Sequence, residues 1–443
     1  MTNTEIPQTS KESKGWLKLF APIWIGQAFS LFGSALVQFA LVWWMTQKTG
    51  SAAVLATASM VAMLPEVFLG PFAGALVDRW NRRRVMIIAD GSVALVTLGL
   101  VLLFATGHVE IWHVYVALFL RSLGGSFHWP AMQASVSLMV PEKHLARVSG
   151  ANQALQGLLR IAAPPLGALL LMALPMFAVL MIDIVTAAIA ILPLALAHIP
   201  QPVRSDSEAT VTPRQVLRDV KEGIRYLVAW PGLLGVMLLA CMINFFLSPT
   251  GAFLPLLVTD HFKGGAFQLG WLESVQGIGL LAGGLLLSVW GGFKRRIITS
   301  LLGVIGVGAG ILLVGLAPAN LYVLALVGLA ITGVMLSLAN GPLFAIFQTS
   351  IAPEMQGRMF TLITSLAGLM SPLGMAISAP IGEYLGVRSW YILAGGLTVF
   401  MGVVGLMIPT ILKIEEQARD RIQNANLGLQ PASEKVASQP AAD

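Results

Sequence analysis

Charged side chains are scarce in this sequence, at 11% of 443 residues, whereas about 25% is usual in soluble domains. Hydrophobic residues make up 56%, and the mean hydropathy is +0.80. The shortage of charge excludes a soluble globular protein. Apolar runs recur from Phe20 almost to Leu412. Because a helix that spans a bilayer needs ~20 such residues, the chain has room for about a dozen spans.

Cysteine and the motifs of catalysis are also nearly absent. Cys241 is the single cysteine, which excludes both a disulfide within the chain and a thiolate metal cluster. The sequence contains no nucleotide-binding loop of the Gly-x-x-x-x-Gly-Lys-Ser/Thr type, so we do not expect ATP hydrolysis to drive its function. Its six histidines show no metal-ligand spacing with carboxylates. We therefore expect neither an enzyme nor a bound metal or cofactor.

Positive charge is present, and its placement is informative. The formal net charge of +6 is compatible with nucleic-acid binding, but the basic residues gather between alternate pairs of apolar runs: at Lys11, Lys14 and Lys18, at 79–84, at Lys143 and Arg147, across 204–225 and at 294–296. The intervening loops hold only Lys48, Lys263 and Arg388. This is the positive-inside asymmetry of membrane proteins. It predicts an even number of spans, both termini in the cytoplasm and no nucleic-acid partner.

Twelve spans are predicted, at about 20–45, 52–77, 85–106, 112–138, 146–172, 176–196, 232–258, 267–290, 297–317, 320–349, 358–383 and 389–412. We expect a cytoplasmic segment over 1–19, six-helix bundles over 20–197 and 232–412, a cytoplasmic linker over 198–231 and a disordered cytoplasmic tail over 413–443. Within the linker, Thr212 as N-cap and Pro213 at the first helical position predict the start of an amphipathic helix on the inner leaflet.

The two bundles carry a repeated pattern of residues. Pro130, Pro141 and Arg147 in the first bundle correspond to Pro342, Pro353 and Arg358 in the second. The run Pro-Leu-Gly at 165–167 recurs at 372–374. A duplicated six-span unit explains this spacing. Parallel repeats about an axis along the membrane normal are typical of the major facilitator fold, so the predicted fold is all-α, with two six-helix halves.

The segment 74–84, Gly-Ala-Leu-Val-Asp-Arg-Trp-Asn-Arg-Arg-Arg, lies between the second and third predicted spans. It resembles the major facilitator signature of that loop, with Asn81 in place of one glycine. The positive-inside rule explains the arginines of this segment but neither its glycine nor its aspartate. A glycine permits close helix approach, and an aspartate can sit at a helix N-terminus and pair with an arginine. We expect a cytoplasmic latch for one conformation, made by Gly74, Asp78, Arg79, Arg82, Arg83 and Asp90.

Further segments look like the macrolide-efflux family of drug:proton antiporters: 24–28 (Trp-Ile-Gly-Gln-Ala), 49–52 (Thr-Gly-Ser-Ala), 119–122 (Phe-Leu-Arg-Ser) and 281–286 (Leu-Ala-Gly-Gly-Leu-Leu). The resemblance covers about residues 16–412. It implies a bacterial inner-membrane transporter that exports amphipathic, macrolide-like drugs in exchange for protons. We expect a monomer whose partners are the substrate, protons and membrane lipid.

Two other functions stay open. The same fold can export a siderophore or a lipid-like metabolite, because one sequence does not identify the cargo. A transport-inactive sensor is disfavoured, because charges at lipid depth are costly to keep. The segment 162–168 resembles the Gly-Pro-x-x-Gly-Gly antiporter motif, with alanine for two glycines, and modestly favours export.

Ionisable side chains at lipid depth are functional candidates by default. Arg121 matches the arginine of a second major facilitator motif, and its fixed positive charge can favour proton release from a nearby carboxyl group. Asp183, Glu273 and Glu66 are the candidate carriers of the coupled proton. For Glu66, binding of a cationic substrate is equally open. Arg160 is a candidate partner of Glu66 or Asp183.

A cavity for amphipathic cargo should have apolar and aromatic walls with a few polar groups. The candidate wall residues are Trp24, Gln27, Gln38, Trp129, Asn244 and Phe245. His128, next to Trp129, either titrates in this cavity or is held by an ordinary hydrogen bond.

Overall fold

The computed structural model describes residues 15–197, 199, 221, 223–351 and 353–426, and these residues form helices joined by short turns. The first six long helices are α1 (Trp16–Thr49), α2 (Ala52–Arg79), α3 (Arg82–Thr106), α4 (Ile111–Met139), α5 (Glu142–Ala173) and α6 (Met176–Leu196). The second six are α8 (Pro231–Leu256), α9 (Ala266–Trp290), α10 (Arg296–Leu316), α11 (Tyr322–Ser350), α12 (Pro353–Leu385) and α13 (Val387–Met407). All twelve predicted spans are therefore confirmed as helices.

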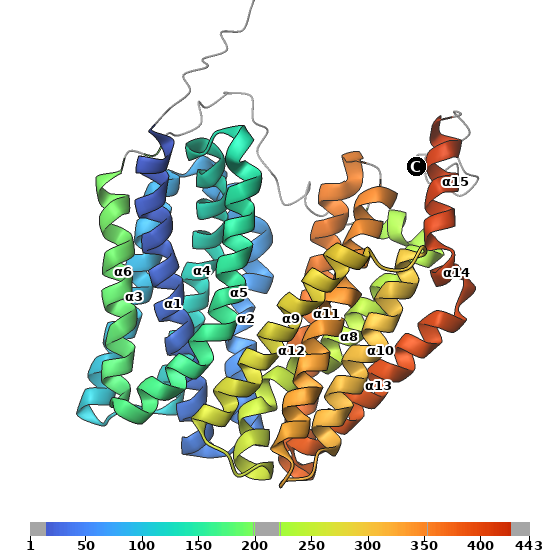
Figure 1. Cartoon of the computed structure of the whole chain (residues 1–443). Helices are drawn as coiled ribbons and strands as arrows, with labels where there is room; N and C mark the ends of the chain where they lie inside the picture. The colour runs from blue at the N-terminus through green and yellow to red at the C-terminus, as the bar shows by residue number, and fades with distance from the viewer. Residues whose placement is uncertain (1–14, 198, 200–220, 222, 352, 427–443) are drawn as a thin grey trace, which may run out of the picture.

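The helices form two halves that stand side by side, α1–α6 and α8–α13 (Figure 1). In the first half α1 packs against α5 and α6, α3 against α4 and α6, and α2 against α4. In the second half α8 packs against α12 and α13, α10 against α11 and α13, and α9 against α11. These are the same pairs in the same order, so the repeated proline pattern does correspond to a duplicated six-helix unit.

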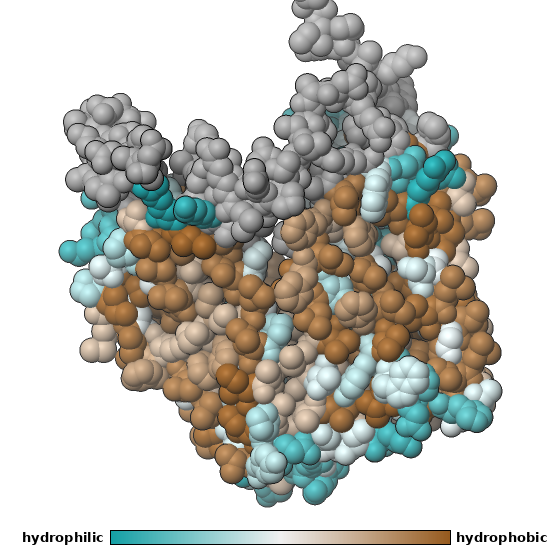
Figure 2. All heavy atoms as spheres, turned by 180° about the vertical axis from the view of Figure 1, so that it is seen from behind, coloured by the Kyte–Doolittle hydropathy of each residue, from teal (hydrophilic) through white to brown (hydrophobic). Residues whose placement is uncertain are grey.

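The chain is a multi-pass membrane protein. Among the described residues, eleven helices are long and apolar enough to cross a bilayer. The twelfth long helix, α4, has 29 residues but contains Arg121, His113 and His128. Figure 2 shows apolar residues over the middle of the visible face, with hydrophilic ones gathered along the lower edge and below the grey atoms. Such a belt is the surface that a lipid bilayer covers.

The halves touch near one end of the molecule, which holds the turns at Gly50, Gly107 and Leu174 and is called here the distal end. The first and last described residues of the chain lie at the opposite end, called the terminal end (Figure 1). The main pairs that join the halves are α5 with α9 and α2 with α12, and α8 makes smaller contacts with α1 and α2. A Cβ added to Gly270 of α9 would lie 2.9 Å from the Cα of Pro165 of α5. Only glycine, which has no Cβ, allows the backbones of α9 and α5 to come this close. Pro165 belongs to the predicted antiporter motif at 162–168.

The predicted tail needs a correction. Residues 413–443 were expected to be disordered, but Ile414–Asn426 form helix α15, which follows the short α14 (Pro409–Leu412). Ile414 is fully buried in an apolar cluster at the terminal end, and Gln417 Oε1 accepts a hydrogen bond from Trp230 Nε1 at 2.9 Å. The apolar contacts explain why this polar segment folds.

The predicted linker helix lies mostly outside the described residues. Of that segment, residues 223–228 are helical.

The departure of Asn81 from the family signature has a structural reason. Asn81 is the N-cap of α3, and its Oδ1 accepts a hydrogen bond from the backbone N–H of Arg84 at 3.1 Å. An asparagine side chain satisfies one of the free N–H groups at a helix start, which glycine cannot do.

Candidate functional site

A central cavity of about 600 Å³ lies between the halves. Helices α1, α2, α4 and α5 line it from the first half and α8, α9 and α11 from the second. Most of the wall is apolar, including Phe39, Met45 and Leu280. Its polar groups are Gln38, Ser59, Gln156, Arg160, Glu273 and Gln276. An apolar cavity with a few polar groups is the usual form of a small-molecule site.

Arg160 and Glu273 bring opposite charges into this cavity from opposite halves. Their helices are in close contact, since Ser274 Oγ donates a hydrogen bond to the carbonyl oxygen of Ile161 at 2.6 Å. Neither charged side chain makes a hydrogen bond or ion pair with another described residue. Both are therefore available to a ligand. The predicted pairing of Arg160 with Glu66 or Asp183 is wrong, because the helix contact places Arg160 beside α9.

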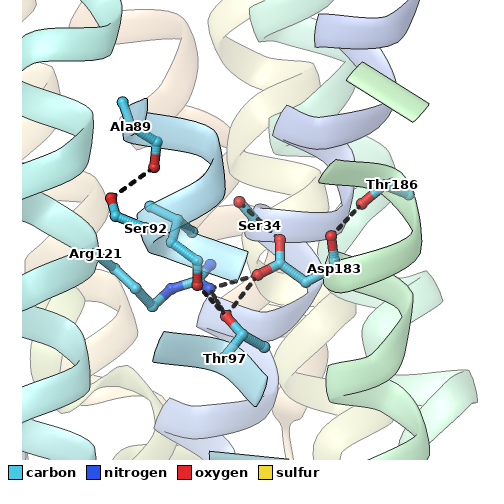
Figure 3. A network of polar contacts seen from close by, with 8 residues as sticks. Ser34, Ala89, Ser92, Thr97, Arg121, Asp183 and Thr186 are labelled. Atoms are coloured by element: carbon cyan, nitrogen blue, oxygen red, sulfur yellow. Dashed lines mark hydrogen bonds and ion pairs between the residues drawn. The ribbon is translucent and has the colours of Figure 1, made fainter. Parts of the chain in front are cut away.

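Asp183 instead pairs with Arg121, inside the first half (Figure 3). The Asp183 side chain is 1% exposed and that of Arg121 9%. Ser34 Oγ and Thr97 Oγ1 each donate a hydrogen bond to the carboxylate at 2.9 Å. Helices α1, α3, α4 and α6 thus converge on one buried carboxylate. A buried ion pair of this kind is retained at a cost in desolvation, which makes it a functional candidate.

A second polar cluster lies in the same half. Gln27 Nε2 donates a hydrogen bond to Asp90 Oδ2 at 2.9 Å, and His128 Nε2 lies 3.3 Å from Asp90 Oδ1. Asp90 therefore pairs with neither Arg82 nor Arg83, with which the predicted latch groups it. Asp90 lies two helical turns into α3 from these arginines, where its neighbours come from α1 and α4. Gln27 is buried against Asp90 and does not line the central cavity.

The arginines at the start of α3 bind helix ends. Arg82 Nη1 donates to the carbonyl oxygen of Ala134 in α4 at 3.0 Å. Arg83 donates to the carbonyl oxygens of Leu194 at 2.6 Å and of Ala195, both in the last turn of α6. Cations are favoured at helix C-termini, where free carbonyl groups and the helix dipole attract them. These two residues therefore hold α3 against α4 and α6.

The other residues of the predicted latch are Gly74, Asp78 and Arg79. The side chains of Asp78 and Arg79 lie outside the described part of the structure. A Cβ added to Gly74 would meet nothing within 4 Å, so the close helix approach expected at Gly74 is absent from this conformation. The halves make their contacts near the distal end, far from this loop.

The predicted cavity wall is largely wrong, because only Gln38 of its six residues lines the central cavity. Trp24 Nε1 donates to Asn152 Oδ1 at 2.7 Å, and Trp129 is 44% exposed. Asn244 lines a small cavity of about 70 Å³ within the second half. Phe245 packs against the core and the Phe246 ring.

Sequence reasoning missed the polar face of α5. Asn152, Gln156 and Arg160 recur every fourth residue, which places them on one face of a helix. Gln156 and Arg160 line the cavity and Asn152 continues that face toward the terminal end. A polar row in a membrane helix is a signal that could have identified this wall.

Glu66 is exposed and makes no hydrogen bond or ion pair with the other residues that the structure describes. It lies two turns beyond Ser59, which lines the cavity. Residues seven apart share a helix face. Glu66 therefore lies on the cavity-lining face of α2, nearer the terminal end.

Comparisons with known proteins agree with this architecture. The family model described as Major Facilitator Superfamily matches residues 23–261 and 236–441. Macrolide efflux protein A of Streptococcus pyogenes is 35% identical over 402 residues, covering 90% of this chain and 98% of that protein. Multidrug efflux pump Tap of Mycobacterium bovis is 26% identical over 426 residues, covering 92% and 96%. The solved structure of a bacterial homologue of the human lysosomal transporter Spinster, inward-facing and unoccupied, has a TM-score of 0.67 at 12% identity, covering 92% and 98%, a likeness of fold alone.

Proposed function

Because the chain belongs to the major facilitator superfamily, and within it to the macrolide-efflux family, we propose that it exports amphipathic, macrolide-like drugs from a bacterial cytoplasm in exchange for protons. One observation carries the proposal: the cavity between the halves, about 600 Å³ in volume, combines an apolar wall with opposite charges at Arg160 and Glu273, which pair with no other described residue. Cavities of ~300–1,000 Å³ suit drug-sized ligands.

The cavity gives the transported molecule two kinds of contact. Phe39, Met45 and Leu280 offer apolar surface to a macrolactone-like ring. Glu273 can bind a cationic amine on the drug, while Gln38 and Gln156 offer amide groups for its hydroxyls. Glu66, on the continuation of this face, extends the negative charge along the route from the cytoplasm.

Proton coupling is assigned to two acids, Asp183 and Glu273. Asp183 is charged while it binds Arg121, and a proton on its carboxyl group would remove the attraction between them. Glu273 cannot hold a proton and bind a drug cation through charge at the same time. Competition between a proton and a drug for one carboxylate is the simplest physical basis of antiport.

Alternating access follows from where the halves touch. We assign the distal end to the outside of the cell and the terminal end to the cytoplasm, by the positive-inside rule. The present conformation then has its outer side closed. The loop with Gly74, Asp78 and Arg79 would latch the halves on the cytoplasmic side in the opposite conformation, which explains the empty space around Gly74.

The domain limits and the mode of action follow from this model. Two rigid halves, 20–197 and 232–412, rock about the cavity, and the linker 198–231 joins them on the cytoplasmic side. The protein works as a monomer in the inner membrane. The work is transport, without a chemical conversion of the drug.

Drug-susceptibility profiling tests the proposal. The full chain is produced in an efflux-deficient host, with the double variant Asp183→Asn, Glu273→Gln at equal membrane abundance as control. We expect increased resistance to macrolides with the wild type alone, abolished by a protonophore. Unchanged susceptibility to macrolides and other amphipathic drugs would refute the proposal, and export of a siderophore or lipid-like metabolite would replace it.

A further inference from the structure

Two polar layers lie at different depths in the first half. The layer nearer the distal end is the Arg121 site, with Ser34 from α1 and Thr97 from α3 around Asp183 (Figure 3). The layer nearer the terminal end is the Asp90 cluster, with Gln27 from α1 and His128 from α4. Each residue of the Asp90 cluster is seven positions from its counterpart in the Arg121 site on the same helix: Gln27 and Ser34, Asp90 and Thr97, His128 and Arg121.

This spacing gives the two layers one orientation and a fixed separation. Seven residues make about two helical turns and a rise of about 10 Å. The same faces of α1, α3 and α4 therefore supply both layers. On each layer, a carboxylate lies beside a basic side chain: Asp183 beside Arg121, and Asp90 beside His128.

The Asp90–His128 pair has the properties of a group that changes charge. Gln27, Asp90 and His128 are all buried, at 3%, 8% and 9% exposure. The Oε1 of Gln27 and the Nε2 of His128 have no hydrogen-bond partner among the described residues, although Nε2 lies 3.3 Å from the Asp90 carboxylate. A proton on that nitrogen would convert a poorly satisfied contact into an ion pair. Imidazole is the side chain that ordinarily changes charge between about pH 5 and 8.

The second half shows that the fold does not need charge at this level. Pro130 and Pro342 are counterparts in the repeat, which aligns His128 with Asn340. Asn340 lines the small cavity of the second half, together with Ser300 and Asn244. At the level where the first half carries an acid and a base, these three residues of the second half are neutral.

We propose that Asp90 and His128 form a second proton-binding site, on the cytoplasmic side of the Arg121–Asp183 pair. The site binds one proton on His128, and a neutral imidazole beside a carboxylate becomes an imidazolium–carboxylate pair. This rests on the proposed proton-coupled export and deepens it, because a proton that leaves Asp183 has a buried station two turns nearer the cytoplasm.

The charged groups around His128 are few. From α3 it faces Asp90, with Arg82 and Arg83 about two turns nearer the cytoplasm. Arg121 on its own helix and Asp183 on α6 lie about two turns away on the other side. Glu66 is on α2, which also packs against α4, and its side chain is exposed. Gln27 is the neutral neighbour from α1. Asp90 is thus the acid in contact with His128.

The test is His128→Asn, which copies the residue of the second half, in the full chain reconstituted in liposomes. We expect slower uphill export than in the wild type, because a proton that leaves Asp183 has lost its next station. We also expect a loss of the pH dependence of uphill export between about pH 5 and 8, while downhill drug equilibration stays within about threefold of wild type. The matched control is His108→Asn, which changes an exposed histidine at the distal end. An unchanged rate of uphill export and an unchanged pH profile in His128→Asn would overturn the proposal.

A measurement on the wild type guards against a variant that fails to fold. The protein has six histidines, so the nitrogen NMR signal of His128 can be assigned by its loss in the variant, or by single-residue labelling. A His128 imidazole that keeps one protonation state from about pH 5 to 8 would refute the second site. If the wild type exports no drug while His128 still titrates, the proposed function fails and the proton site stands.

Discussion

Glu383, at the end of α12, accepts a hydrogen bond from the Oγ of Ser51 at 3.0 Å. The same carboxylate oxygen accepts one from the backbone N–H of Ala53 at 3.2 Å. Ser51 is the N-cap of α2, so a carboxylate of one half binds the N-terminus of a helix in the other. Free N–H groups and the helix dipole favour an anion there. In the rocking movement proposed above, this contact is lost when the halves separate at the distal end.

Replacing Glu383 by Gln should therefore open the outer side more often. A charge at a helix N-terminus contributes about 0.3–1 kcal/mol, which corresponds to a roughly two- to fivefold change in the ratio of the two conformations. Spin labels at Thr106 and Asn320, in a background with Cys241→Ala, would report the distance between the halves. Glu110→Gln is the matched control, because Glu110 caps α4 within one half. An unchanged distance distribution in Glu383→Gln would show that the contact has no role in gating.

Gly270→Val should favour the outward-open conformation more strongly. Any Cβ at this position would meet the backbone of Pro164 at 3.0 Å and of Pro165 at 2.9 Å. Overpacking of this kind costs about 1–3 kcal/mol, a roughly five- to hundredfold change in the ratio of conformations. Gly284→Val, on the same helix but in open space, should behave as wild type. The same spin-label distances measure both, and equal effects of the two substitutions would contradict the argument.

Arg121→Ala should destabilise the protein by about 3–5 kcal/mol, because it leaves the buried carboxylate of Asp183 without its partner. Adding Asp183→Asn should recover much of this loss, since the double variant buries no unpaired charge. Thermal unfolding in detergent of the wild type, both single variants and the double variant gives the coupling energy. Additive effects would mean that the two side chains do not depend on each other.

Asp183→Asn and Glu273→Gln mimic permanently protonated acids. Each variant should lose uphill export, because it cannot exchange drug for a proton. Asp183→Asn should keep downhill drug equilibration, whereas Glu273→Gln should keep it for uncharged drugs and bind cationic drugs more weakly. Proteoliposomes with an imposed proton gradient measure both activities in one preparation. If the double variant still exports drug with undiminished dependence on the gradient, the proton is carried elsewhere, and Glu66 becomes the leading candidate.

Asp78→Asn should leave the protein inserted but slow transport at least tenfold, because it removes a contact made in only one of the two conformations. The substitution should shift the spin-label distances toward the outer-closed state, opposite to Gly270→Val. Export at the wild-type rate, with equal abundance in the membrane, would rule out the cytoplasmic latch.

The sequence was sufficient to predict the fold because its signals are local. A run of ~20 apolar residues identifies a span wherever it packs, and the proline spacing identified the repeat. The acids and Arg121 were found from their lipid depth, together with the match of Arg121 to a major facilitator motif. Their partners were not, since pairing depends on the rotation of each helix. Asp183 and Arg121 were both candidates, yet only the packing of α6 against α3 brings them together.

The cavity wall was poorly predicted for the same reason. Aromatic character does not distinguish a cavity from a lipid-facing surface, and Trp129 illustrates the error. The polar row of Gln156 and Arg160 was a better signal, because a polar side chain in a membrane helix must face protein or water. Helix α15 was missed because its helical form depends on burying Ile414 and Ala418 against the second half.

Arg121 also constrains the order of events during synthesis. It belongs to α4, the long described helix that is not among the eleven apolar enough to cross a bilayer, and its partner Asp183 lies 62 residues later in the chain. When α4 leaves the ribosome, the carboxylate that will neutralise Arg121 does not yet exist. An arginine at the centre of a span costs about 2.5–3.5 kcal/mol on insertion. We therefore expect α4 to be held least firmly in the bilayer until α6 arrives, so that the first half is completed as one unit.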